Sequence, residues 1–374
     1  MNARRAGPAP ADGDGETGPD RIPGAPHPRD TPALFGQARA ESEFLAAFNS
    51  GRLHSGWLLA GPQGVGKATL AWRIAALLLA APDGPATSLD LPPDDPDLRL
   101  IRRGAHPRLF VLRRAPAEKG EGFRARITVD ETRRLRDFFQ LSAADGGRRV
   151  VIVDAADEMN PSAANALLKL LEEPPALATL LLVAHRPAAL LPTIRSRCRM
   201  LRLHPLAPDD LARALAPILG DAASPALAEL AAGSVGRAVV LALAGGEAVY
   251  AELARLLATL PRLDRAGAAR LAESCAGKAN EARLGQMLDM ADLILARTAR
   301  AGLTGPPAHE AAPGEAALLA RLAPDDRAAR VWADLQQDVQ ARLRFGRAVN
   351  LDPASLILDM LVRIERTAAA LAAS

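Results

Sequence analysis

The stretch GPQGVGKAT holds the residue types and the spacing with the clearest chemical potential. Gly61, Gly66 and Lys67 fit the phosphate-binding pattern G-x-x-x-x-G-K, in which glycines let backbone N–H groups surround phosphate oxygens and the lysine ammonium reaches the β- and γ-phosphates. The Ser or Thr hydroxyl that normally comes next and ligates Mg²⁺ is replaced by the methyl group of Ala68. Thr69 lies about 100° further round the expected helix and should point elsewhere. The stretch therefore predicts nucleotide binding with a poorly held metal.

A carboxylate follows a second apolar segment. VVIVDAAD places Asp154 at the end of a buried strand, where a parallel sheet has its ligand-facing edge and where a metal-shell carboxylate belongs. Hydrolysing relatives have a Glu next, which orients the attacking water, but Ala155 stands here, and Asp157 either substitutes for it or caps the turn. Loss of both groups predicts a site that binds ATP or ADP without turnover, with a weak ATPase as the alternative. The residues expected to contact the nucleotide are Gly61, Gly64, Gly66, Lys67, Thr69 and Asp154.

Apolar segments of two kinds alternate along the first half of the chain. Short runs that are apolar on both faces stand at 57–60, 149–154 and 179–184, and helical stretches stand at 68–80 and 161–173. This alternation predicts an α/β fold, with a parallel sheet covered by helices on both sides. Beyond about Pro205 the strand pattern ends, and the remainder is Ala/Leu-rich helix.

These patterns predict four regions along the chain. Residues 1–30 are rich in Pro, Gly and charge and should form a disordered tail. A P-loop domain is expected at 31–205, a small helical domain at 206–265, and a second helical domain at 266–374.

Composition narrows the functional class. The formal charge is only +3 and the aromatic fraction is 3%, so any DNA contact should go to phosphates through Arg rather than to stacked bases. Two cysteines, Cys198 and Cys275, cannot build a disulfide framework or a four-thiolate zinc site. The chain shows no apolar signal core and no apolar run of the ~18 residues that a membrane span requires. We therefore expect a cytoplasmic protein without a membrane partner.

Two long stretches resemble a known family. VVIVDAADEMNPSAANALLKLLEEPP (150–175) and TLLLVAHRPAALLPTIRSRC (179–198) resemble the clamp-loader branch of the AAA+ ATPases, among them the subunits of bacterial DNA polymerase III. The likeness runs from about Pro32 to Pro205, and NLDPASLILDML (350–361) is similar to the family's C-terminal helix. It implies an AAA+ domain, a helical lid and a C-terminal helical collar through which subunits assemble into a ring.

The resemblance gives one arginine a role. In clamp loaders, the arginine of a Ser-Arg-Cys triplet reaches into the ATP site of the neighbouring subunit as a trans arginine finger, and Arg197 holds that position here. From composition alone, an Arg in this loop would be a solvated surface group, because the chain is rich in Arg. Cys198 beside it is expected to be a small buried hydrophobe.

Departures from the family favour a subunit that is not a motor. The family's four-cysteine zinc insert is missing, so no zinc is expected. Its nucleotide-sensing Arg would fall on Gly236, with Arg237 one position late, and Ala184 and His185 stand where a sensing Thr is usual.

The resemblance then implies a non-motor clamp-loader subunit. Such a subunit inserts its arginine finger into the ATP site of a neighbouring ATPase and helps to place a sliding clamp on primed DNA. Such a chain would have no polymerase activity and weak or no ATPase activity of its own. The alternatives are a motor subunit in which Thr69 and Asp157 substitute, and a small-molecule P-loop kinase.

Overall fold

The computed structural model describes residues 18–81, 84–118, 122–141 and 146–373. The chain divides into two compact units. The first, here called the sheet unit, comprises residues up to Ile218 together with Gly233–Val239; the second, the helical unit, comprises Leu219–Ala232 and Val240–Ser374. None of the described helices combines the length and the apolar character that a bilayer span requires.

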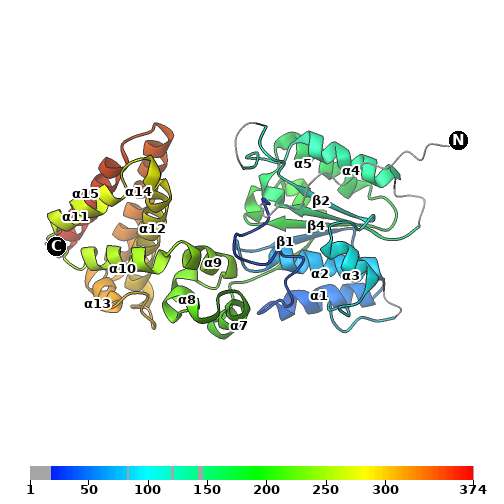
Figure 1. Ribbon diagram of the computed structural model, residues 1–374, viewed down its shortest axis with the longest axis horizontal. Coiled ribbons are helices and arrows are strands. Elements are labelled where there is room, and N and C mark those ends of the chain that lie inside the picture. Colours follow the sequence, from blue (N-terminus) through cyan, green and yellow to red (C-terminus); the bar gives the residue numbers. More distant parts are fainter. Residues whose placement is uncertain (1–17, 82–83, 119–121, 142–145, 374) are drawn as a thin grey trace. The chain divides into compact units, whose positions relative to one another are not determined.

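A five-stranded parallel sheet forms the core of the sheet unit (Figure 1). Its spatial order is β2-β3-β4-β1-β5, and all the pairings between neighbouring strands are parallel. The strands are β1 (Gly56–Ala60), β2 (Leu109–Arg113), β3 (Arg149–Asp154), β4 (Ala178–Ala184) and β5 (Arg199–Arg202). Every residue of β1 and β4 is buried, as expected for strands covered on both faces. The predicted α/β class with a parallel sheet is confirmed.

Helices cover both faces of this sheet. Figure 1 shows α4 and α5 on one face and α1, α2 and α3 on the other. Their bounds are α1 (Ala38–Asn49), α2 (Lys67–Ala80), α3 (Pro96–Arg102), α4 (Val129–Leu141), α5 (Pro161–Glu172) and the single turn α6 (Pro192–Arg195). The Asn160 side chain accepts a hydrogen bond from Ala163 N at 2.8 Å, and Pro161 begins α5. This start was predicted from the sequence, because Asn favours the N-cap and Pro the first helical position.

Three helices follow β5, and the boundary between the units crosses them. They are α7 (Pro208–Leu219), α8 (Pro225–Ala231) and α9 (Val235–Leu243). Nearly all of α7 and the first half of α9 belong to the sheet unit, whereas α8 belongs to the helical unit. The stretch 206–265 is thus shared between the two units, and its assignment as a separate lid domain stays a prediction.

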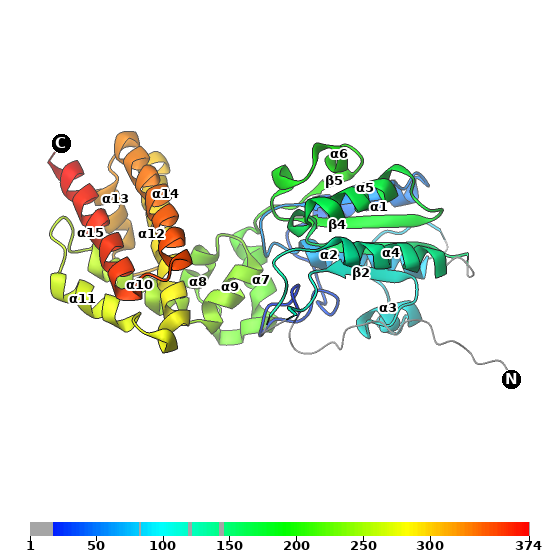
Figure 2. The same ribbon diagram turned by 90° about the horizontal axis from the view of Figure 1, so that it is seen from above.

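The helical unit contains no strand among its described residues. Its remaining helices are α10 (Gly246–Leu257), α11 (Arg265–Ser274), α12 (Glu281–Thr304), α13 (Glu315–Leu322), α14 (Asp326–Ala348) and α15 (Pro353–Ala372). The long helices α12 and α14 pack along each other, and α15 packs against α14 (Figure 2). Buried Leu, Ile, Met and Ala side chains form the interior, as the Ala/Leu-rich sequence predicts.

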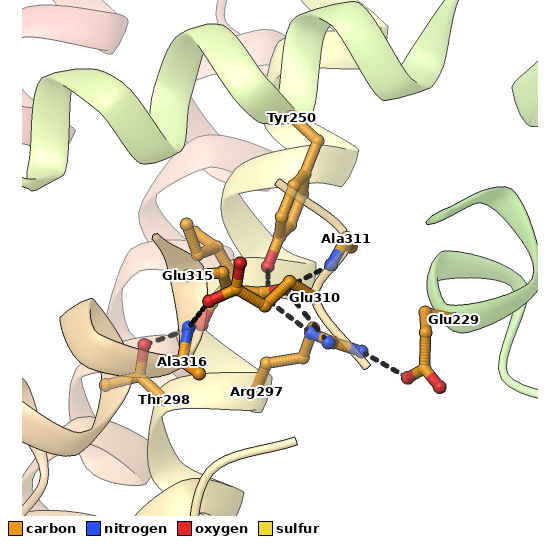
Figure 3. Close-up of polar contacts among 9 residues, drawn as sticks. Glu229, Tyr250, Arg297, Thr298, Glu310, Ala311, Glu315 and Ala316 are labelled. Carbon is orange, nitrogen blue, oxygen red and sulfur yellow. Dashed lines mark hydrogen bonds and ion pairs between the residues drawn. The ribbon is translucent and has the colours of Figure 1, made fainter. Parts of the chain in front are cut away.

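A buried ionic cluster ties four helical segments of this unit together (Figure 3). The carboxylate of Glu315, which is completely buried, accepts hydrogen bonds from Arg297 Nε at 2.6 Å and Arg297 Nη2 at 3.2 Å. It also accepts from the Tyr250 hydroxyl and from Ala311 N, the latter at 2.6 Å. Arg297 Nη1 lies 3.4 Å from Glu229 on α8. Because every charged atom has a partner, the cluster avoids the large cost of burying an isolated ion.

The segment 18–30 corrects one predicted boundary. It was assigned to the disordered tail, but Asp20 accepts two hydrogen bonds from Arg113 Nη1, at 2.9 and 3.1 Å, and its side chain is 1% exposed. His27 is buried and meets the Trp72 ring edge-on, with ring centroids 5.6 Å apart. Composition missed this because a few well-placed partners, distant in sequence, hold a segment that has little apolar surface. The rest of the predicted tail, residues 1–17, lies outside the described residues.

Candidate nucleotide site and arginine finger

The loop between β1 and α2 has the geometry of an anion cradle. Gly64 and Gly66 have φ of 77° and 97°, in the left-handed region that favours glycine. A Cβ on Gly66 would lie 2.5 Å from Leu34 Cδ1, and one on Gly64 would overlap the Ser234 hydroxyl. In the described part of the chain, no backbone oxygen accepts from the N–H groups of Gly64, Gly66 or Lys67. These donors at a helix N-terminus are therefore available to an anion.

Lys67 lies in the same loop with little solvent contact. The residue is 3% exposed, and its Nζ donates to the Pro62 carbonyl oxygen. Burial lowers the pKa of Lys67 to about 8, against the opposing attraction of Asp154 and Asp157. The ammonium is still charged at neutral pH, but it has lost much of its hydration without gaining a close carboxylate.

Asp154 occupies the end of β3, as predicted. Burial raises the pKa of its carboxyl group to about 7; Asp20 contributes in the same direction, and Lys67 opposes it. No hydrogen bond to another described residue satisfies this carboxylate. The site thus contains a cation and a carboxylate that both lack strong partners.

These residues face a cavity of about 440 Å³ within the sheet unit. Five of the six residues expected to contact nucleotide line it: Gly64, Gly66, Lys67, Thr69 and Asp154. The opposite wall comes from the segments 19–22 and 31–35, from α7, and from the start of α9. Its volume is in the range of cavities that hold small-molecule ligands.

Gly61 stands apart from this group, because it does not line the cavity. A Cβ at this position would overlap the Leu203 carbonyl oxygen, in the chain that leaves β5. The structure therefore gives Gly61 a packing role at the edge of the sheet. Thr69 does line the cavity and is 9% exposed, whereas the sequence suggested that it would point elsewhere.

Asp157, the candidate substitute for a water-orienting Glu, is already engaged. Its carboxylate accepts from the backbone N–H groups of His185 at 3.0 Å and Arg186 at 3.1 Å, and its side chain is 1% exposed. It joins the turn after β3 to the end of β4. Burial and the nearby Lys67 lower the pKa of His185 to about 4, so this imidazole is neutral at pH 7. The described residues contain no cluster of three His, Cys, Asp or Glu that could hold a metal ion.

The segment 234–236 closes over the loop from the other side. Ser234 Oγ donates to Gln63 O at 2.9 Å, and Gly236 N donates to Gly64 O at 3.2 Å. A Cβ at Gly236 would lie 2.7 Å from Ile22 Cδ1. The Cβ would also lie 3.0 Å from Gly64 Cα, so a side chain at the position where the family's sensing Arg would fall would require Ile22 and the loop to shift. Neither the role of Ser234 nor that of Ile22 was predicted, since both act across long sequence separations.

Arg197 lies just after α6 on the surface, away from the cavity of its own chain. Its side chain is 38% exposed; Nη1 donates to Thr193 O at 3.1 Å, and Nη2 pairs with Glu172 at 3.0 Å. Glu172 ends α5 within the EEPP stretch, where no sequence pattern indicates a role for it. The neighbouring Cys198 is only partly buried, not fully buried as expected, and it packs against the edge of the core. Burial raises the pKa of its thiol to about 12, so the side chain remains a thiol at neutral pH.

Comparisons with known proteins agree with this arrangement. A family described as "DNA polymerase III, delta subunit" matches residues 36–207. DNA polymerase III subunit delta′ of Pseudomonas aeruginosa is 39% identical over 222 residues, covering 58% of this chain and 64% of that protein. The delta′ subunit of Escherichia coli K12 is 36% identical over 167 residues, covering 44% of this chain and 46% of that protein. The chain thus spans less than two thirds of the length of these relatives.

A solved structure gives a further match. A DNA polymerase III gamma subunit-related protein from Thermotoga maritima is 20% identical, with a TM-score of 0.35 and coverage of 87% of this chain and 99% of that chain. Over residues 36–207, the chain is thus similar to the delta and delta-prime subunits of DNA polymerase III.

Proposed function

We propose that the chain is a non-motor subunit of a DNA polymerase III clamp loader. In this role, Arg197 enters the ATP site of a neighbouring subunit and stabilises the charge that develops on the γ-phosphate during hydrolysis. The chain thereby helps to load a sliding clamp on primed DNA. The carrying observation is that Arg197 stands on the surface, held by Glu172 and Thr193, and outside the chain's own cavity.

The residues of the chain's own nucleotide site support the proposal that this subunit binds nucleotide without hydrolysing it. The glycine cradle, Lys67 and the cavity fit the phosphates and the base of ATP or ADP. Mg²⁺ fits poorly, because Ala68 offers no oxygen, and water activation fits poorly, because Ala155 has no carboxylate and Asp157 holds the backbone after β4. A bound nucleotide would then stabilise the structure as a ligand and would not be hydrolysed as a substrate.

Partners follow from the same assignment. The chain would join other clamp-loader subunits in a hetero-oligomeric ring, and through the complex it would meet the sliding clamp and primed DNA. The helical unit, with its long packed helices, is the part proposed to assemble with other subunits. Contacts to DNA would go to phosphates through arginines.

The test is Arg197→Ala in the reconstituted loader. ATP hydrolysis stimulated by clamp and primed DNA should fall by about 10³–10⁵-fold, the range found for arginine fingers, while the subunits still co-elute in gel filtration. Arg195→Ala is the matched control, because Arg195 lies two residues away and, among the described residues, its guanidinium donates to the Pro187 carbonyl oxygen and pairs with no carboxylate. Retained turnover in the Arg197 variant, or an equal loss in the Arg195 variant, would remove the finger assignment.

A further inference from the structure

Residues 18–30, here called the strap, form part of one wall of the nucleotide cavity. The apolar strap residues that line the cavity are Pro19, Ile22, Ala25, Pro26 and Pro28. Ile22 also reaches the segment that covers the phosphate loop, since a Cβ on Gly236 would lie 2.7 Å from Ile22 Cδ1. A ligand that fills the cavity would therefore contact the strap as well as the phosphate loop.

The backbone of the strap bonds to itself. Its backbone-to-backbone hydrogen bonds join Arg21 N to Gly18 O, Ala25 N to Ile22 O, and Asp30 N to His27 O. These bonds close local turns, and the strap contains neither helix nor strand. Within the described ranges, no such bond joins the strap to the rest of the sheet unit. The strap can therefore move away without breaking a backbone hydrogen bond of the sheet, as is typical of segments that open locally.

Two side chains hold the strap in place. Arg113 Nη1, at the end of β2, donates to both carboxylate oxygens of Asp20, at 2.9 and 3.1 Å. The Asp20 side chain is 1% exposed, so it serves as an anchor and not as a contact for a ligand. His27 Nε2 lies 3.4 Å from Asp20 Oδ2, and the His27 ring meets the Trp72 ring edge-on. Opening the strap thus requires these side-chain contacts to separate.

We propose that the position of the strap is coupled to the occupation of the cavity: a bound nucleotide holds the strap closed, and an empty site lets it open. This coupling rests on the nucleotide binding proposed above. A ligand that contacts the apolar wall formed by the strap binds the closed form more tightly than the open form. By thermodynamic reciprocity, closing strengthens binding by the same factor by which binding strengthens closing. A site that holds nucleotide without hydrolysing it would then use the nucleotide to set the position of the strap.

Hydrogen–deuterium exchange of the full chain, with and without ADP, tests this coupling. Mass spectrometry of peptides from the strap measures the exchange, and a fluorescent ADP analogue reports binding on the same sample. With ADP at about 100 times its Kd, exchange of the strap amides should slow by about 10- to 100-fold, because the ligand stabilises the closed form. Peptides from α14 in the helical unit should exchange at an unchanged rate.

Two variants loosen the strap from different ends. Arg113→Gln removes the charge that holds Asp20 and should speed strap exchange in the empty protein by about 10- to 100-fold, the value of a hydrogen bond to a charged group. ADP should bind this variant more weakly, in proportion to the closed fraction that is lost, and should restore part of the protection. His27→Ala removes the contact with Trp72 without altering β2 and should act in the same direction.

The outcomes separate the strap from the nucleotide site. Arg133→Ala is the matched control, because it breaks an exposed pair with Asp130 on α4 and should change neither strap exchange nor ADP affinity. Strap exchange that is the same with and without bound ADP would overturn the coupling and leave the nucleotide site standing. An equal effect of Arg133→Ala on strap exchange would also overturn the coupling. Absence of ADP binding to the wild type would overturn both the coupling and the proposed site.

Discussion

Two buried pairings of a cation with carboxylates, one in each unit, differ in how fully they are satisfied. In the helical unit, the Glu315 carboxylate receives Arg297, Tyr250 and the N–H of Ala311 (Figure 3). In the part of the sheet unit that the structure describes, the Lys67 ammonium donates to the Pro62 carbonyl oxygen alone, and the Asp154 carboxylate accepts no hydrogen bond. Both sets contain ionisable groups that are removed from water, yet only in the first does the protein itself supply the hydrogen-bond partners.

The pKa shifts express the same difference. The pKa of Arg297 is raised, because its hydrogen bonds to Glu315 outweigh the cost of burial, so the pair stays ionised. Burial instead lowers the pKa of Lys67 to about 8 and raises that of Asp154 to about 7, moving both groups toward their neutral forms. A buried network in which every polar group has a hydrogen-bond partner stabilises one fold. Buried groups that lack such partners can instead form hydrogen bonds and ion pairs with a ligand.

The largest expected effect comes from breaking the saturated cluster. Glu315→Ala leaves the Arg297 charge buried without its main partner, which should cost about 3–5 kcal/mol of the free energy of unfolding. Urea denaturation of the full chain measures this cost. Glu310→Ala is the control, because Glu310 accepts only backbone N–H groups at an exposed turn. A loss below about 1 kcal/mol in the Glu315 variant would show that the cluster is not the structural support described here.

Removing a charged side chain from the nucleotide site should weaken nucleotide binding rather than lower the free energy of unfolding. Lys67→Ala removes a charge-assisted contact to phosphate and should weaken nucleotide binding by about 10- to 100-fold. Its unfolding free energy should change by less than about 1 kcal/mol, because the desolvated ammonium contributes little to the fold. In the assembled loader, its effect on ATPase should be milder than that of Arg197→Ala. Equal or greater damage would contradict a passive site.

The raised pKa of Asp154 predicts that the stability of the sheet unit depends on pH. Its folded pKa of about 7 lies above its unfolded value of about 3.9, so the folded state holds the proton more tightly and stability is lost as pH rises from about 4 to 7. Asp154→Asn does not titrate and should gain about 2–3 kcal/mol relative to the wild type between pH 5 and pH 8. Urea unfolding at the two pH values tests this. A parallel pH dependence in the two proteins would contradict the raised pKa.

The smallest expected effect lies on the surface. Glu172→Ala frees Arg197 from one of its two partners, and ordering a mobile Arg on binding costs about 0.5–1.5 kcal/mol. Stimulated ATPase of the reconstituted loader should therefore fall about three- to tenfold, while stability changes by less than about 0.5 kcal/mol because the pair is exposed. Glu173→Ala, one residue further on, should leave turnover unchanged. Unaltered turnover in the Glu172 variant would mean that the pair does not position the finger.

The parts of the site that the sequence predicted are those encoded by local spacing. The glycines at 64 and 66, Lys67 and Asp154 sit within two short motifs, each directly after a strand, so a parallel sheet had to bring them to one edge. Asp20 could not be predicted in the same way, because its partner Arg113 is 93 residues away and its surroundings resemble a disordered tail. Ser234 reaches Gln63 across 171 residues, with no pattern to indicate the contact.

We propose that the chain binds nucleotide without hydrolysing it. This proposal can be tested by measuring steady-state ATP hydrolysis by the purified chain beside nucleotide binding by fluorescence on the same sample. We predict binding that Lys67→Ala weakens, with no turnover above a protein-free background. Turnover that disappears in both Lys67→Ala and Asp154→Asn would contradict the claim, because the missing metal ligand and carboxylate would then have been replaced and the chain would be a motor.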